Sequence, residues 1–425
     1  MSKSLVLGAV AGAVIVALAG GYYFGVKTAK GQTPNVIAKV VNDGNAVSQQ
    51  YFDGSWLIKS EKDESADSFS GDRYKIKLIS KDDNKEYVTI TGDNSYGLTS
   101  VTTDYKVKFA DADDPDTKAF LSKLEQSISG TSTFSAFGKK LSSVISLADN
   151  KFEVSDGSIE WGKAEFSASD VDVENPQLAN YSGFFEGLKI NSKDDSAPLA
   201  INFESLKYDF DDSKAEVGLK SFNFKFADQL IALNGFKFDV KNKVDLSQKK
   251  ASVEFGADLG NLDLVKVLPE IGDLKIENFK FDLQLNNLNA AGFLDKCKLN
   301  NTREDWYKIS SCASGLNEAD LTSASLVTVN NSSGLIKIDS KVNASAINLD
   351  FNYKVDGEAK NVFEILKLIK LNASLKFDKS LFDNVPALGE LKSFAAPYVV
   401  DKGDKFEAVF DCAGAKCNLN GKKFF

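Results

Sequence analysis

Four cysteines are the residues whose chemistry is easiest to assign, and they fall into two close pairs. Cys297 and Cys312 are 15 positions apart, and Cys412 and Cys417 are 5 apart. Short-range disulfides are the simplest pairing of an even set in an exported chain, although four cysteines allow three connectivities. A zinc site of four thiolates is the alternative, but neither pair has the C-x2-C spacing that such sites prefer. We therefore predict two disulfides and a body that folds in an oxidising compartment.

Histidine is absent from the 425 residues. Its absence removes the commonest general base, the commonest metal ligand and every nucleophile–histidine pair. The sequence also contains no phosphate-binding glycine loop, nucleophile elbow or dinucleotide fingerprint. Chemistry by paired carboxylates stays open, because 60 acidic residues always supply candidate pairs. We predict that the protein is not an enzyme and uses no cofactor or metal.

The densest acidic cluster is the segment DADDPDT, with Asp111, Asp113, Asp114 and Asp116. Oxygen-rich loops of this kind can hold calcium, but the spacing does not match the twelve-residue calcium loop. Pro115 and the residues after it read more simply as a turn that leads into a helix. We predict a solvated turn.

The charge balance argues against nucleic acid as a partner. The net charge is −9, and almost all basic residues are lysines, with Arg73 and Arg303 the exceptions. Nucleic-acid recognition favours a basic face and arginine forks that bind phosphates and base edges in pairs. We predict no nucleic-acid binding.

Residues 4–26 form an uncharged stretch of 23 residues near the N-terminus. A helix of this length covers roughly 35 Å, enough to cross the hydrocarbon core of a bilayer. Tyr22, Tyr23 and Phe24 lie where an aromatic interface belt is expected. A cleaved signal peptide, cut after Ala19, is the alternative, but the apolar run continues past that site. We predict an uncleaved anchor at 4–26, a cytoplasmic tip at 1–3 and a stalk helix at 27–50.

The remaining residues, 51–425, are dominated by strand patterns. The clearest runs over 236–246, where apolar residues alternate with lysine and aspartate. Such a strand has one dry face and one wet face. Similar patterns follow one another with few helices between them, so we predict a mainly β (β-rich α+β) body. Its sheet is expected to be elongated, mostly antiparallel and meandering, with a few short helices and a boundary near Pro198.

Five segments interrupt the strand patterns with helical spacing of apolar residues. They are residues 116–130, 135–148, 262–268, 289–295 and 361–370. In the last of them, Val362, Ile365, Leu366 and Ile369 form one stripe. We predict short helices at these positions.

The chain contains 31 phenylalanines, and most lie on alternating strand positions. Phe222, Phe224, Phe236 and Phe238 are the densest example. Such residues can fill a core, or they can line an open apolar groove that holds an acyl chain or a partner segment. Core packing is the simpler expectation, and the groove is the alternative.

Two short motifs at opposite ends of the body resemble one family. The segment YFDGSW at 51–56 follows the predicted stalk, and LNGK at 419–422 lies near the C-terminus. Together with the anchor, they resemble the YdgA-like family of bacterial envelope proteins. The resemblance implies a periplasmic, non-enzymatic protein that is anchored in the inner membrane, and it implies no catalytic residues.

These observations predict a single-pass bacterial inner-membrane protein with its body in the periplasm. The first functional hypothesis is a scaffold or assembly factor of the cell envelope that binds other envelope proteins. The second is a lipid or lipoprotein carrier that uses the phenylalanine-lined sheet. A filled core at the four phenylalanines would favour the scaffold, and an open apolar face would favour the carrier.

Overall fold

The computed structural model describes residues 38–423 with short gaps. The gaps are at positions 39–40, 43, 47, 50–51, 69–70, 97–99, 136–139, 155, 173–178, 193–197, 269–271, 386–387, 390 and 415. The predicted tip (1–3) and anchor (4–26) lie outside the described residues, as does the first part of the predicted stalk. No helix among the described residues is both long and apolar enough to cross a membrane.

The chain divides into two compact units, Met1–Ile190 and Asn191–Phe425, here called unit 1 and unit 2. Every strand pairing described below is antiparallel, and the helices are short. The predicted fold class, a mainly β chain with a large antiparallel sheet and a few short helices, is confirmed. The domain ranges expected from the sequence stay predictions.

Unit 1 is built on an antiparallel sheet whose strands pair in the order β1, β2, β3, β4, β5, β6, β9 and β10. Their bounds are β1 Trp56–Lys62, β2 Gly71–Ser80, β3 Glu86–Tyr96, β4 Ser100–Phe109, β5 Ile128–Ser135, β6 Lys140–Leu147, β9 Ala164–Asp172 and β10 Asn180–Ser192. A hairpin of β7 (Asn150–Val154) and β8 (Gly157–Trp161) and the helix α3 (Pro115–Ser127) complete the unit.

Unit 1 has a filled hydrophobic core. On β2 every second residue is buried, including Ile76 at 1% exposure, and Val88 on β3 is 2% exposed. The helix α3 packs onto this face, where the Phe120 ring lies 5.6 Å from that of Phe152 and 5.7 Å from that of Trp161. Alternating strands and a covering helix therefore form a two-layer core.

The described residues between 38 and 49 are helical and pack against the edge strand β1. The Asn45 side chain accepts a hydrogen bond from the Ile58 N–H at 2.8 Å and donates one to the Ile58 carbonyl at 3.1 Å. The Ser48 hydroxyl bonds to the backbone of Trp56 in the same way. These side chains satisfy backbone groups that an edge strand otherwise exposes.

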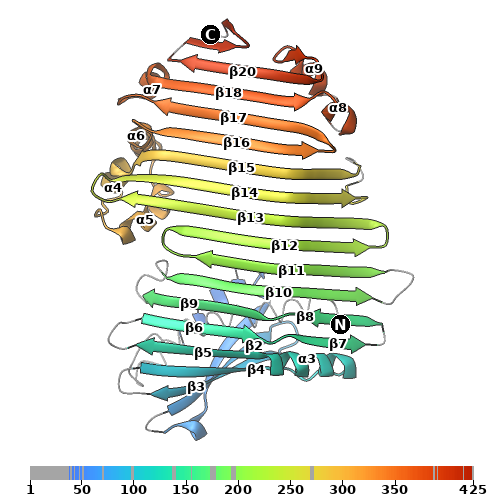
Figure 1. Cartoon of the computed structure of the whole chain (residues 1–425). Coiled ribbons are helices and arrows are strands. Elements are labelled where there is room, and N and C mark those ends of the chain that lie inside the picture. Colours follow the sequence, from blue (N-terminus) through green and yellow to red (C-terminus); the bar gives the residue numbers. More distant parts are fainter. Residues whose placement is uncertain are drawn as a thin grey trace. The chain divides into compact units, whose positions relative to one another are not determined.

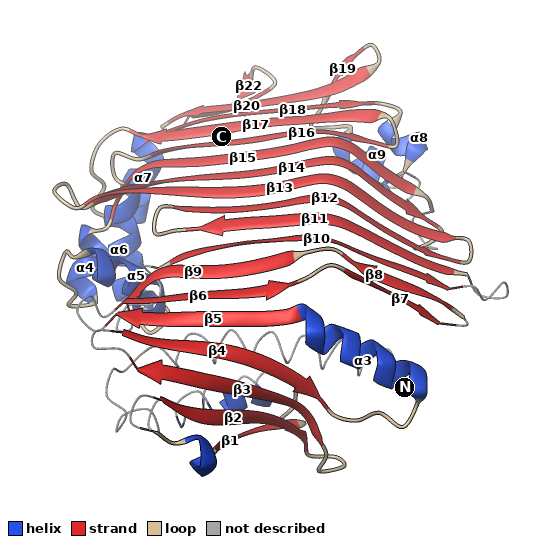
Figure 2. Ribbon diagram, turned by 60° about the horizontal axis from the view of Figure 1, so that its bottom comes forward, coloured by secondary structure: helices blue, strands red, loops and turns tan. Residues whose placement is uncertain are grey.

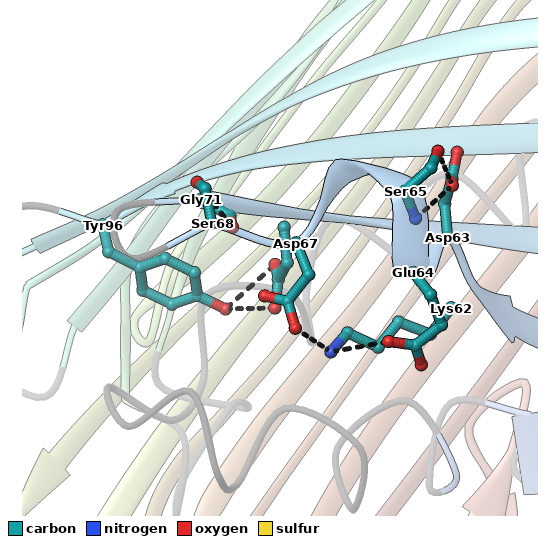
Figure 3. Close-up of polar contacts among 9 residues, drawn as sticks. Lys62, Asp63, Glu64, Ser65, Asp67, Ser68, Gly71 and Tyr96 are labelled. Carbon is teal, nitrogen blue, oxygen red and sulfur yellow. Dashed lines mark hydrogen bonds and ion pairs between the residues drawn. The ribbon is translucent and has the colours of Figure 1, made fainter.

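Polar contacts fix the connection between β1 and β2 (Figure 3). Lys62 donates to Asp67 at 2.8 Å and lies 3.7 Å from Glu64. Asp63 caps the short 3-10 helix η1 (Glu64–Ala66) by accepting hydrogen bonds from the N–H and hydroxyl of Ser65. The connection is therefore held by a cap and a surface ion pair.

Unit 2 is built on a long antiparallel sheet in which β11 to β18 each pair with the next strand of that series, and β18 pairs with β20. The bounds are β11 Leu199–Phe210, β12 Lys214–Phe226, β13 Gln229–Asp245, β14 Lys250–Val265, β15 Leu274–Asn289, β16 Ser333–Val342, β17 Ser345–Val355, β18 Ile369–Asp378 and β20 Lys405–Ala413. The outer side of β20 pairs with β19 (Val400–Lys402) and β21 (Lys416–Leu419), and β21 pairs with β22 (Lys422–Lys423).

The helices of unit 2 lie at the ends of its strands (Figures 1 and 2). Between β15 and β16 lie α4 (Ala291–Lys296), α5 (Arg303–Ala313) and α6 (Glu318–Val329), and between β17 and β18 lies α7 (Val362–Leu368). The helices α8 (Leu381–Asn384) and α9 (Leu391–Ala395) lie at the opposite strand ends. None of these helices crosses the middle of the sheet in either view.

Three of the five predicted helices are confirmed, and two predictions were wrong. Helices occur within or close to 116–130, 289–295 and 361–370, as α3, α4 and α7. Residues 140–147 instead form β6, and the first part of 262–268 is the end of β14. Both segments mix β-branched and leucine residues that suit either structure, and pairing with neighbouring strands decides the outcome.

A matched pair of substitutions tests the filled core of unit 1. We expect Val88→Ala to lower the free energy of unfolding by about 2–3 kcal/mol, because it removes buried methyl groups and leaves a cavity. Val144→Ala on β6, where the side chain is 40% exposed, should cost less than about 1 kcal/mol. Urea unfolding followed by tryptophan fluorescence measures both. Equal effects of the two substitutions would contradict a filled core around Val88.

Candidate functional site

One face of the unit 2 sheet is apolar from β11 to β21. Residues directly opposite in an antiparallel pair lie on the same face, so the strand register defines rows across the sheet. The first row is Phe210, Ala215, Val240, Phe255, Leu283, Ile336, Phe351, Ala373, Phe410 and Leu419. The second row is Tyr208, Val217, Phe238, Ala257, Phe281, Ile338, Leu349, Leu375 and Ala408. These two rows together are called the apolar face.

Every residue of the apolar face is half-buried, and none is fully buried. The rings shield one another sideways: Phe255 lies 4.9 Å from Phe238 and 5.4 Å from Phe281, both edge to face. The apolar surroundings raise the pKa of Tyr208 by burial. Lateral packing of this kind removes part of each side chain from water but leaves an apolar surface over it.

The opposite face of the same strands is charged. One row across it consists of Lys237, Asp258, Lys280, Asp339, Asn348, Lys376 and Glu407. Most neighbours in this row have opposite charges, and Asn348 forms a hydrogen bond with one of its two neighbours. Lys376 lies 3.1 Å from Glu407, and the Asn348 amide donates to Asp339 at 2.6 Å. Cross-strand pairs of opposite charge stabilise this register and mark the face that meets water.

The first disulfide, Cys297–Cys312, lies in the α4–α6 insertion at one end of the strands. The insertion contacts the turn between β11 and β12, where Arg303 lies 2.9 Å from the Asp212 carboxylate and the Tyr307 hydroxyl donates to the Asp212 carbonyl at 2.8 Å. The disulfide joins the end of α4 to α5. It therefore holds together a helical block that adjoins the strand ends.

The second disulfide, Cys412–Cys417, joins two residues that lie opposite each other in the β20–β21 hairpin. Both disulfides have the pairing predicted from the sequence, and no cysteine is free. All four sulfur atoms therefore belong to structural disulfides.

A line of five residues interrupts the strand alternation in β11–β15. The strand pairs on either side of this line place its residues opposite one another. The residues are Ser205, Lys220, Gly235, Gly260 and Asn278. Three of them have positive φ, namely Ser205 at 50°, Gly235 at 68° and Asn278 at 51°. A left-handed residue changes the direction of an extended chain, and the long strands β13 and β14 bend along their length (Figure 2).

The four phenylalanines singled out from the sequence lie on the two sides of this line. Phe236 and Phe238 are on β13, opposite Leu219 and Val217 of β12. Phe238 belongs to the apolar face. Phe222 and Phe224 lie beyond the line on β12. All four are half-buried. Sequence alternation found these residues, whereas the rows that run across the strands follow from the register.

A buried polar row in unit 1 is the other arrangement that could carry chemistry. It runs through Asp72, Asn94, Thr103, Ser132 and Ser143, all buried. Asn94 donates to Asp72 at 2.7 Å, Thr103 donates to Asn94 at 2.7 Å, and the two serine hydroxyls lie 2.8 Å apart. The side chains satisfy one another, as buried polar groups in a structural network do.

The acidic segment at 111–116 forms the turn predicted from the sequence. Asp114 caps α3 by accepting hydrogen bonds from the N–H and hydroxyl of Thr117 at 2.7 and 2.6 Å, and these bonds lower the pKa of Asp114. Asp111 lies 3.5 Å from Lys118. Within the described part of the chain, no group of acidic or cysteine side chains is arranged to hold a metal ion.

Comparison of the chain with protein-family models, curated proteins and solved structures found no match. The resemblance to the YdgA-like family therefore stays a prediction from its motifs. In the structure, Trp56 of the first motif begins β1, and Gly421 of the second makes the turn between β21 and β22.

Removing each disulfide in turn tests its local role. The chain-entropy model gives about 3 kcal/mol for a loop of 15 residues and about 2 kcal/mol for a loop of 5. We expect Cys297→Ala with Cys312→Ala to raise hydrogen exchange in residues 291–329 and to leave the hairpin at 405–419 unchanged. Cys412→Ala with Cys417→Ala should do the reverse, with a smaller effect. Uniform exchange changes across unit 2 in both variants would contradict local stabilisation.

Proposed function

We propose that this protein is a membrane-anchored carrier or binding protein for lipid, in which the apolar face of unit 2 shields acyl chains from water. The observation that carries the proposal is the half-buried state of every residue in both rows. A large contiguous apolar surface on a folded protein usually belongs to a binding site for a ligand, a membrane or another protein. The charged row on the opposite face gives the sheet one side for water and one for an apolar ligand.

The two units of one chain make the contrast direct. In unit 1 the apolar face is covered by α3 and the β7–β8 hairpin, and its residues are buried. In unit 2 the helices lie at the strand ends, and a small cluster of described residues near α8, Phe377, Leu381, Phe382 and Val385, is buried. The chain can therefore form a filled core, whereas the described helices of unit 2 form no layer over most of its sheet (Figures 1 and 2).

The dimensions and energetics suit an acyl chain. Ten paired positions on strands spaced about 4.8 Å apart extend over roughly 40 Å of sheet, more than the ~15 Å that acyl chains occupy in one leaflet. Each methylene removed from water contributes about 0.8 kcal/mol when fully buried. An acyl chain that lies on one side of a sheet is only partly buried, so each of its methylenes contributes part of this free energy. Lipid bound here would be held by many small contributions along its length.

The scaffold function, expected first from the sequence, is the second candidate. The apolar face also supports the scaffold if a segment of another protein covers this face. An apolar surface can bind either acyl chains or apolar side chains. Phe236 and Phe238 are half-buried, which is what an open apolar face would produce and which supports the carrier. We place the carrier first for this reason.

The location is part of the proposal. Two disulfides suit an oxidising compartment, as the periplasm is. The uncharged stretch at 4–26 would anchor the chain in the inner membrane, and the YdgA-like resemblance implies the same compartment. An anchored body with an apolar face would take lipid from, or deliver it to, the membrane beside it.

Site-specific photo-crosslinking in cells that make the full chain tests the carrier. A photoreactive amino acid at Phe255, in the middle of the first row, should give covalent lipid adducts that mass spectrometry identifies after denaturing purification. The matched control is Glu254, the next residue on the same strand, which is exposed on the charged face. We expect several-fold fewer lipid adducts there, because neighbouring strand residues point to opposite faces.

The same experiment separates the two candidates. Adducts at position 255 that contain only protein, with no lipid, would contradict the carrier and favour the scaffold. Equal lipid adducts at 254 and 255 would indicate non-specific contact with the membrane and would also contradict it.

A further inference from the structure

The helix α7 presents an apolar patch to solvent. Phe363 is 78% exposed, the highest value among the large apolar side chains of the described residues, and Val362 and Leu366 are 55% and 54% exposed. These positions lie on adjacent parts of the helix surface, since residues four apart share a face. Single exposed apolar residues are ordinary, whereas three together on a helix of 7 residues form a patch. Val362, Phe363 and Leu366 are called the α7 patch.

The helix that carries the patch is firmly held. Asn361 caps it by accepting a hydrogen bond from the Glu364 N–H at 3.0 Å, and the Glu364 carboxylate accepts one from the Lys360 N–H at 2.8 Å. This reciprocal arrangement resembles a capping box. Just before it, Ala359 is buried and its backbone bonds to the Asn330 side chain at 3.0 and 3.4 Å. The exposed side chains are therefore presented by an ordered helix.

The patch is edged by positive charge. Lys360 and Lys367 are exposed, and neither forms an ion pair with a described residue. Glu364 is the acid of α7, and its carboxylate bonds to the start of the helix. Lys354 and Lys370 lie 2.6 and 2.8 Å from the Asp356 carboxylate, and their hydrogen bonds lower the pKa of Asp356. Two lysines that form no ion pair with the described part of the chain thus flank three apolar side chains.

The size of the patch favours a membrane over a protein partner. Three such side chains present on the order of 300 Å². A stable protein interface takes about 800 Å² from each partner, so the patch alone is too small for one. A bilayer needs no complementary shape, and apolar side chains flanked by lysines are the composition of segments that lie in the membrane interface. Lysine stems can also reach up from the apolar layer to lipid phosphates.

The patch is continuous in the chain with the apolar face. Ile369 follows α7 directly, and Ile369, Leu371 and Ala373 alternate along β18, so they share one face. Leu371 lies between Tyr353 on β17 and Cys412 on β20. The tight turn at Gly414, with φ of 61°, adjoins the Lys367 carbonyl and bonds to Ile369 at 2.9 Å. Apolar side chains therefore lead from the end of α7 to Ala373 in the first row of the apolar face.

We propose that the α7 patch docks the protein on an anionic bilayer surface. Phe363, Val362 and Leu366 enter the boundary between headgroups and acyl chains, and Lys360 and Lys367 contact the lipid phosphates. The contact brings one end of the apolar face to the bilayer from which lipid would move. This purpose rests on the function proposed above, whereas the docking itself does not.

A single-cysteine label in the full chain tests the docking. All four native cysteines are in disulfides, so Phe363→Cys gives one reactive thiol for an environment-sensitive fluorophore. Vesicles are made of phosphatidylcholine with or without phosphatidylglycerol, and nitroxide-labelled lipid serves as quencher. We expect lipid-dependent emission and quenching at position 363, stronger with phosphatidylglycerol. The matched control is Leu321→Cys on α6, 40% exposed, which should show neither.

Charge reversal supplies the second variant. Lys360→Glu with Lys367→Glu should weaken the phosphatidylglycerol-dependent signal by roughly tenfold or more, because each lysine near an anionic surface contributes to binding. Both lysines are exposed, so these substitutions leave the core intact.

Two results would overturn the docking. One is a water-exposed signal at position 363 in all vesicles. The other is an apolar signal without lipid that grows with protein concentration, which would mean that a second copy of the chain covers α7. Photo-crosslinking at Phe255 reports the proposed function separately. Lipid adducts at 255 without lipid contact at 363 would refute the docking alone, and the reverse would refute the carrier alone.

Discussion

The antiparallel register of the unit 2 sheet is the constraint on which the rest of the unit depends. Opposed residues share a face, so the register alone decides whether the apolar residues of ten strands form one surface. A slip of one residue in any strand would turn its apolar residues to the charged side. The charged row favours the same register, because Lys376 meets Glu407 and Asn348 meets Asp339 only in this alignment. Both faces thus specify one pairing.

Much of this architecture could be predicted from the sequence where local pattern and tertiary context agree. The alternation at 236–246 belongs to β13, the stripe at 361–370 contains α7, and both cysteine pairs form the nearest disulfides. The failures have a common cause. Residues 135–148 show an apolar spacing that fits a helix, but Leu141 and Ile145 are buried between β5 and β9, where strand pairing outweighs a weak helical preference.

The candidate site was only partly predictable, for a physical reason. Alternation in the sequence indicates that one face of a strand is shielded from water. It does not indicate which part of the structure covers that face. The strands of unit 1 and unit 2 carry the same kind of pattern, yet Val88 is buried and Phe255 is half-buried. The difference arises from α3, whose position over the unit 1 sheet is set by long-range packing. The interruption of the strand at Gly235 could not be predicted from the sequence either. A glycine within a strand can indicate either a bulge or a close approach of another backbone.

An open apolar sheet risks association with other sheets, and the structure limits this risk at the β20 edge. The outer side of β20 is divided between two short strands, β19 and β21, and the Asn420 side chain accepts a hydrogen bond from the Val409 N–H at 2.8 Å in the gap between them. Short, interrupted edge strands rich in lysine discourage the addition of a further strand. Strand addition is thus opposed at this edge, while the described helices of unit 2 lie at the strand ends and away from the middle of the apolar face (Figures 1 and 2). A ligand that needs no backbone pairing, as an acyl chain does not, fits this combination better than an extended peptide.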